Sequence, residues 1–320
     1  MFVTPEMLLD NGRVRKGTLV RALAPVGIYW RGSFTAPGAL YSADDSLVYI
    51  AIHFDESLHE GDYYTEFDDP TLEEVRLLAA LSLPIGWDGG VVSLYPCHPE
   101  LRIPSFLDLA DPNVDEELRA RLAEVEPERS GLWHADPPPP PIHGGQAYDF
   151  RSSETPFELQ KQIFSKINLD DHLLLRGLSA WLKAGMLRHH RPFAVEALFS
   201  MYVSLDASFS LVCRELRNRG VANPTAMDAG RFLDEAEGRE PEGMPYFGDF
   251  YSDRIRLMHP DNRFGITPYP PAMNGDLVHL NQALREVYRL LLLGAMIDPH
   301  NYDDPESPGH SGKSTTRYQA

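Results

Sequence analysis

Five consecutive prolines at residues 137–141 separate two halves of different character. Proline has no backbone N–H donor and a fixed φ angle, so such a run excludes a regular helix or a central strand. It favours polyproline II, a stiff extended conformation. We therefore predict a linker over residues 131–152, for which a spacer role is favoured over that of a proline-rich ligand for a partner domain.

Residues 1–130 carry the signals of mixed structure. Short β-branched and aromatic runs occur at 18–23, 27–30 and 47–54, with turn residues between them. Thr71, followed by two acids and an apolar periodicity, predicts a helix start. We expect a small acidic α+β domain that senses a trigger or regulates the second half. Trp87 and Asp88 lie in a glycine-rich turn at 86–90 and could form a ligand site. The favoured interpretation is that the Trp87 ring anchors the turn.

The second half, residues 153–297, has the 3.6-residue apolar periodicity of helices. Helices are predicted near 155–167, 170–182, 192–219, 224–236 and 276–293, with Asp276 as the cap of the last. Their number and short connections predict an all-α bundle. Residues 111–130 form either an acidic helix or a solvated connector. The polar tail at 298–320 lacks periodicity and is predicted to be disordered.

Charge is distributed unevenly between the halves. The net charge is −18; residues 1–150 carry 25 acids and 10 Lys or Arg, whereas residues 151–320 carry 22 and 19. The first half would repel nucleic-acid phosphate, and the second could accept RNA only through a local basic patch.

Cysteine and histidine usage indicates no disulfide framework and no metal site. Cys97 and Cys213 lie in different segments, and Cys213 falls on an apolar helical stripe, where a small buried hydrophobe is expected. No His-Glu-x-x-His or Cys-x-x-Cys pattern occurs. We expect no metal and no cofactor. The N-terminus lacks the features of a signal peptide, so a cytoplasmic location is predicted.

The segment 246–265 combines a helical stripe with two residues suited to chemistry. Proline at 260 disfavours helix before it, so the helix is predicted to end near His259, five residues after Arg254. Imidazole titrates near neutral pH and suits general acid–base catalysis. A guanidinium forms a fork that matches phosphate.

One acid, Asp206, interrupts an apolar stripe of the long helix predicted at 192–219. The stripe consists of Val195, Phe199, Tyr202, Asp206, Phe209, Cys213 and Leu216. Burying an unpaired carboxylate is costly, so Asp206 should have a partner, and Arg254 is the natural candidate. Both a structural pair that joins two helices and a catalytic arrangement remain open.

The pattern Tyr251-x-x-Arg254-x4-His259, at the end of a helix in a helical bundle, resembles the Arg-x4-6-His motif of the HEPN superfamily. The resemblance covers about residues 155–297 and is closest to the abortive-infection and RNA-cleaving toxin branch. The segment MYVSLDASF around Asp206 also resembles a helix that carries an acid in that branch.

This resemblance implies a metal-independent endoribonuclease that acts in phage defence or as a regulated toxin. Its catalytic residues would be Arg254, His259 and Asp206, in a composite site shared by two protomers. The implied partners are RNA and a second copy of the chain. Neither DNA binding nor membrane association is expected. Many members have a small polar residue after the Arg, where this chain has Ile255. That departure favours the alternative, a non-catalytic dimerisation or partner-binding module.

The last predicted helix has a wider apolar face than one packing seam requires. Its apolar residues are Leu277, Leu280, Leu284, Val287, Tyr288, Leu291, Leu292 and Leu293. If this face is exposed, it indicates a homodimer interface. The alternative is that it packs within the chain, under the 224–236 helix or against the N-terminal domain.

Overall fold

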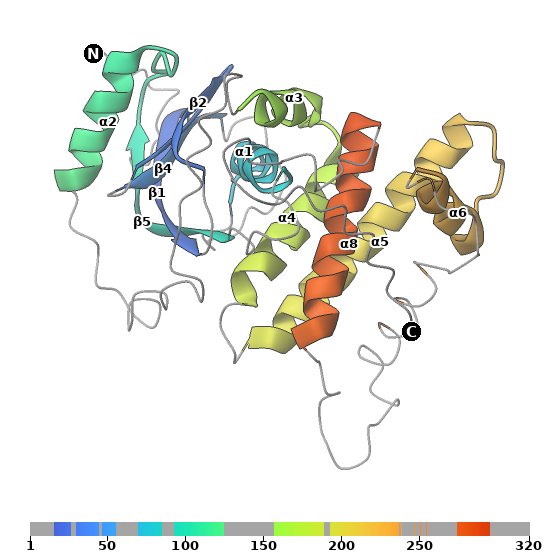
Figure 1. Cartoon of the computed structure of the whole chain (residues 1–320). Coiled ribbons are helices and arrows are strands. Elements are labelled where there is room, and N and C mark those ends of the chain that lie inside the picture. Colours follow the sequence, from blue (N-terminus) through green and yellow to red (C-terminus); the bar gives the residue numbers. More distant parts are fainter. Residues whose placement is uncertain are drawn as a thin grey trace, which may run out of the picture.

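The computed structural model describes residues 16–26, 30–44, 47–55, 70–84, 93–124, 157–188, 193–236, 238, 247, 250, 254 and 274–294. An antiparallel sheet with helices is followed by a C-terminal helical region, which confirms the predicted fold class (Figure 1). The predicted linker, the glycine turn with Trp87 and Asp88, and the C-terminal tail lie outside the described residues.

The sheet contains five strands in the order β2-β3-β4-β1-β5. Their bounds are β1 Lys16–Val26, β2 Gly32–Ala36, β3 Ala39–Ala43, β4 Val48–Asp55 and β5 Ser93–Ile103. β1 and β4 were predicted, whereas β2 and β3 were missed. They form a hairpin joined by Pro37 and Gly38, and Gly38 has a φ of 72°. Because proline followed by glycine is a turn signal, this hairpin could have been found in the sequence.

Side chains of successive residues in a strand point to opposite faces, and both faces of this sheet are covered. One face, which includes Leu19, Ile50 and Ile52, packs against α1 (Leu72–Ser82). The other, which includes Val20 and Ala51, packs against α2 (Pro112–Glu124). Figure 1 shows α1 and α2 on opposite sides of the strands. This double coverage explains why β3 is buried along its whole length.

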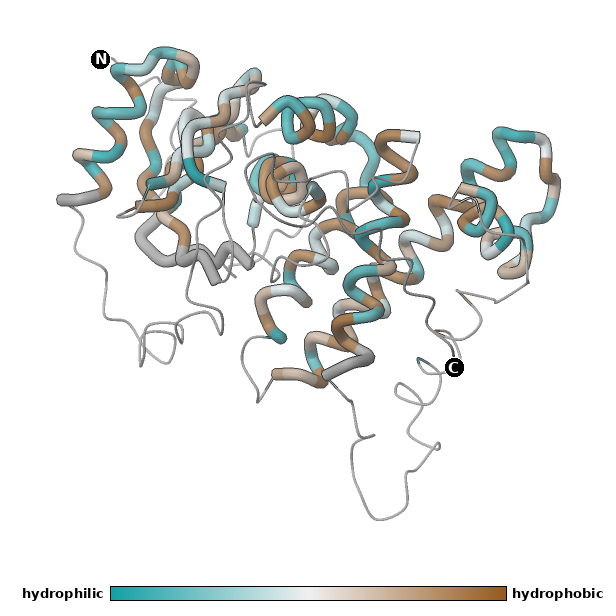
Figure 2. The backbone as a smooth tube through the Cα atoms, viewed as in Figure 1, coloured by the Kyte–Doolittle hydropathy of each residue, from teal (hydrophilic) through white to brown (hydrophobic). Residues whose placement is uncertain are grey.

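The C-terminal helices are α3 Glu158–Lys166, α4 His172–Leu187, α5 Ala194–Asn218, α6 Ala226–Ala236 and α8 Asn274–Leu293. Asp171, at the predicted start of this helix, caps α4 by accepting a hydrogen bond from the Leu174 N–H. Asp276 is not the cap of the last helix, because α8 already begins at Asn274. In Figure 2, α2 is largely hydrophilic, whereas hydrophobic residues recur along α4, α5 and α8.

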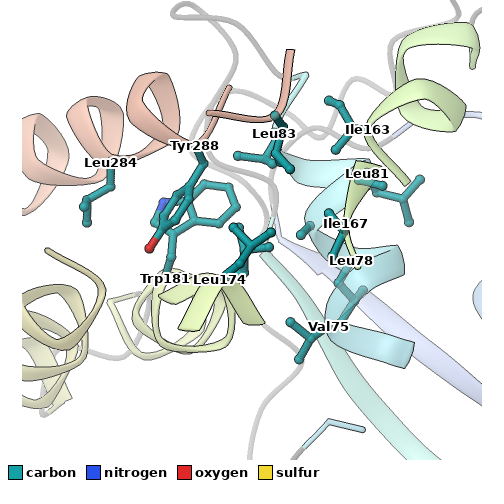
Figure 3. Packing of buried hydrophobic residues seen from close by; sticks show 14 of the residues in the cluster. Val75, Leu78, Leu81, Leu83, Ile163, Ile167, Leu174, Trp181, Leu284 and Tyr288 are labelled. Atoms are coloured by element: carbon teal, nitrogen blue, oxygen red, sulfur yellow. The ribbon is translucent and has the colours of Figure 1, made fainter. Parts of the chain in front are cut away.

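The sheet and the C-terminal helices share one hydrophobic core. α1 lies between them, and its residues from Val75 to Leu83 include members of the same buried cluster as α3, α4 and α8. Figure 3 shows Leu78 and Leu83 of this part facing Ile163, Trp181 and neighbouring residues from the other helices. Buried residues on both sides of the predicted linker thus belong to one cluster among the described residues.

Helix α8 is buried within the chain over most of its surface. Seven of its apolar residues are buried: Leu277, Leu280, Leu284, Val287, Tyr288, Leu290 and Leu292. Leu291 and Leu293 are partly buried against the same core, and Val278 is exposed. Arg289 on the same helix donates a hydrogen bond from Nε to the Leu83 carbonyl oxygen, so α8 is attached to the end of α1. The wide apolar face predicted to form a dimer interface is used inside the protomer, and it gives no support to a homodimer.

Glycine at position 177 of α4 allows α8 to approach closely. A Cβ atom there would lie 2.2 Å from the Tyr288 hydroxyl oxygen and 2.9 Å from the Ala207 Cβ. That hydroxyl is held by Ser204, with 2.8 Å between the two hydroxyl oxygens and a 3.1 Å bond to the Ser204 carbonyl oxygen. Burial raises the pKa of Tyr288, although the hydrogen bond with Ser204 lowers it, so the phenol keeps its proton.

We expect Gly177→Ala to lower the free energy of unfolding by about 1–2 kcal/mol. Alanine gains about 1 kcal/mol in helix propensity, but overpacking among three helices costs about 3 kcal/mol. Urea unfolding measures the difference. Adding Tyr288→Phe removes the clashing oxygen, so the double variant should lose less than the sum of the two single losses. Strict additivity would contradict this account.

Candidate functional site

Helix α5 is the 25-residue element that positions the candidate site. It ends at Asn218, close to the predicted end at 219. Gly220 follows with a φ of 95°, and the Gly220 and Val221 N–H groups donate to the Arg217 and Leu216 carbonyl oxygens. Among the described helices, α5 alone is long and apolar enough to cross a membrane, and 56% of its most apolar window is buried. A core helix has the same composition, and α5 packs against α4 and α8.

Asp206 lies at the edge of the buried face of α5 rather than inside it. The buried face passes through Met201, Leu205, Ser208 and Val212, whereas the Asp206 side chain is 36% exposed. The predicted stripe therefore lies at the border of the buried face, where Tyr202 and Cys213 are buried and Phe199 is exposed. The carboxylate is nevertheless not fully solvated. Its Oδ1 atom is buried and accepts no hydrogen bond from the described residues.

Arg254 forms the predicted ion pair with Asp206, with 2.8 Å between Nη2 and Oδ2. Phe247 and Phe250, seven and four residues earlier on the same helical segment, belong to the hydrophobic core or pack against it. The Phe247 ring meets the Phe209 ring of α5 edge-on, with centroids 5.0 Å apart. These contacts hold the segment on α5 and bring Arg254 to Asp206.

The pair is a weak source of stability. Both side chains are partly exposed, at 27% for Arg254 and 36% for Asp206, and pairs in such positions contribute about 0–1 kcal/mol. The buried Oδ1 of Asp206, without a donor among the described residues, offsets part of that gain. The arrangement suits orientation better than stabilisation: Asp206 fixes the guanidinium of Arg254, whose side chain is partly exposed to solvent.

Other residues of the predicted site lie outside the described part of the chain. These are His259 and Ile255, the residue that follows Arg254 in the sequence. Thus the structure brings together two of the three predicted catalytic residues, and the position of the third stays a prediction.

Cys213 is buried on α5, as its place in the sequence predicts. Burial raises the pKa of the thiol, and Asp228 also raises it, whereas Arg217 lowers it. A thiol with a raised pKa is a poor nucleophile at neutral pH, so Cys213 is a packing residue.

A polar face of α8 was missed in the sequence. Asn281, Arg285 and Arg289 lie one turn apart and are buried. Desolvation, followed by repulsion from Arg289, lowers the pKa of Arg285 to about 9. Arg289 bonds Glu286 as well as the Leu83 carbonyl, so this face fixes α8 to the sheet domain. This face could have been recognised in the sequence from Arg285 and Arg289, which lie four residues apart in a leucine-rich helix.

No family model matches the chain, and no curated protein or solved structure matches it either. The HEPN resemblance and the function that it implies therefore rest on the motif and on the geometry of the Asp206–Arg254 pair.

Proposed function

We propose that the chain is a metal-independent, HEPN-type endoribonuclease whose site is formed by Arg254, His259 and Asp206. The observation that carries this proposal is the Asp206–Arg254 ion pair, in which both side chains are partly exposed to solvent. Its geometry suits a guanidinium that is oriented by one carboxylate and presented to an anion.

The reaction uses the ribose 2′-OH of RNA as an internal nucleophile. As the 2′-oxygen attacks phosphorus and the bond to the 5′-oxygen breaks, His259 transfers protons as general base or acid. Arg254 stabilises the charge that develops on the phosphorane oxygens, and Asp206 positions Arg254. The products are a 2′,3′-cyclic phosphate and a 5′-hydroxyl. No metal or other cofactor is needed for these steps.

In a composite site, each of two protomers contributes one Arg and one His to a shared cleft. This dimer rests on the HEPN resemblance alone, because the apolar face of α8 is buried within the chain. We propose a cytoplasmic role in phage defence or as a regulated toxin. The acidic sheet domain, which shares its core with the helices, is suited to hold that activity in check.

The alternative function is a non-catalytic dimerisation or partner-binding module in which the Asp206–Arg254 pair is structural. Ile255 favours it, since this residue replaces the small polar residue found after the Arg in many HEPN proteins. The modest stabilisation expected from a partly exposed pair argues against it.

Replacing Arg254 separates the two functions. We expect Arg254→Gln to lower the rate of RNA cleavage in a chelator-containing buffer by about 100-fold, as when one charge-stabilising donor is removed. The same change should cost less than about 1 kcal/mol in urea unfolding, because the pair is partly exposed. Asp206→Asn keeps a group able to orient Arg254 and should lose less activity. Absence of cleavage by the unaltered chain, together with a large loss of stability in Arg254→Gln, would establish the structural alternative.

A further inference from the structure

One face of α5 contains Asp206 together with an exposed phenylalanine, an exposed arginine, a serine and a valine. We call it the outer face. We define this face by Phe199, Val203, Asp206, Ser210 and Arg217. Phe199 and Arg217 are separated by five full turns of an ideal helix, about 27 Å, and therefore point in the same direction. Phe199, Ser210 and Arg217 are exposed, while Val203 and Asp206 are partly so.

The geometry points to this face as the binding surface for single-stranded RNA, with Phe199 stacking on a nucleobase and Arg217 contacting a backbone phosphate on either side of Arg254. This inference rests on the proposed function, because it places the scissile phosphate at Arg254. It adds the residues that bind the strand on either side of that phosphate and the path of the strand along α5.

Phe199 has the properties of a stacking platform. Its side chain is 37% exposed, and it has no ring contact with another described aromatic residue. It lies two turns from Asp206, about 10 Å along the helix, which is comparable to the reach from a phosphate across its ribose to a base. Val203 lies between them and supplies an apolar floor. Bases stack on exposed aromatic rings with little regard to sequence.

The charges along the helix limit the strand to this part of α5. Arg217 lies on the side of Arg254 opposite to Phe199 and is exposed to solvent. Glu196 is exposed one turn before Phe199, where it would repel a phosphate. A backbone that follows α5 from Arg217 past Arg254 is therefore expected to leave the helix at Phe199, where a base rather than a phosphate meets the protein.

The test is binding of a fluorescein-labelled, 2′-O-methylated single-stranded RNA, which lacks the 2′-hydroxyl nucleophile. By anisotropy, Phe199→Ala should weaken binding about tenfold at every salt concentration, because stacking is not ionic. Phe199→Trp should bind as well as the unaltered chain, and its emission should be quenched on binding. Phe106→Ala is the matched control, because Phe106 is an exposed aromatic residue that follows β5 on the sheet.

Arg217→Gln should instead lower the slope of log K against log salt by about 0.7, the contribution of one phosphate contact with a single strand. Arg121→Gln on α2 is the control for loss of an exposed arginine. Unchanged affinity and salt slope in Phe199→Ala and Arg217→Gln, with cleavage intact in the unaltered chain, would overturn this inference alone. If the unaltered chain neither bound nor cleaved RNA, the proposed function would fall as well.

Discussion

Replacing His259 with Ala is expected to lower the RNA-cleavage rate by about 10²–10⁴-fold, the usual contribution of one general acid or base. Imidazole is the side chain whose ordinary pKa lies nearest neutrality, so its loss removes the group best suited to proton transfer at neutral pH. The measurement is the single-turnover cleavage rate of a labelled RNA, combined with growth of cells that express each variant. Growth inhibition by the unaltered chain should disappear in His259→Ala.

A matched control is available on α8. His279 is an exposed histidine, so His279→Ala removes the same chemical group from a position outside the proposed site. It should cleave RNA at the rate of the unaltered chain. Equal cleavage by the His259→Ala variant and the unaltered chain would remove His259 from the mechanism.

Removing the carboxylate of Glu74 is expected to cost about 3–5 kcal/mol, the largest stability loss predicted for this chain. Glu74 is buried in α1 and forms an ion pair with Arg21 of β1, with 2.6 Å between Nε and Oε1. Their side chains are 1% and 8% exposed, so Glu74→Ala leaves a buried guanidinium without this carboxylate. It also removes the capping box with Thr71.

The neighbouring acid provides the comparison. Glu73 lies in the same first turn of α1 and interacts with the same helix dipole, but it is not buried. Glu73→Ala should therefore cost less than about 1 kcal/mol. Both variants are measured by urea unfolding at neutral pH. Similar losses for the two would show that the buried ion pair contributes little.

Local signals in the sequence were sufficient to predict where several helices begin or end. Thr71 caps α1 at the predicted helix start, Asp171 caps α4 close to its predicted start, and Gly220 follows the end of α5 in the left-handed region. These features depend only on neighbouring residues, which is why they could be predicted. The shared core could not, because α1 is buried by contacts with residues more than eighty positions away, such as the bond from Arg76 Nε to the Phe164 carbonyl oxygen.

The candidate site, too, could be predicted from the sequence only in part. The pairing of Asp206 with Arg254 followed from the cost of burying a lone carboxylate, although Asp206 is less buried than its stripe indicated. Phe199 belongs to the same predicted stripe and was assigned to the core. Its exposure depends on which side of α5 the other helices cover, and periodicity alone does not determine that.

The most direct test of the proposed function is the chemistry of the RNA ends produced by the full-length chain in excess EDTA. Attack by the 2′-oxygen predicts fragments that end in a 2′,3′-cyclic phosphate and begin with a 5′-hydroxyl, and no cleavage of 2′-O-methylated RNA. Mass spectrometry distinguishes these ends from a 3′-hydroxyl and a 5′-phosphate. Fragments with 5′-phosphates, or no cleavage of unmodified RNA, would contradict the proposal of a metal-independent ribonuclease.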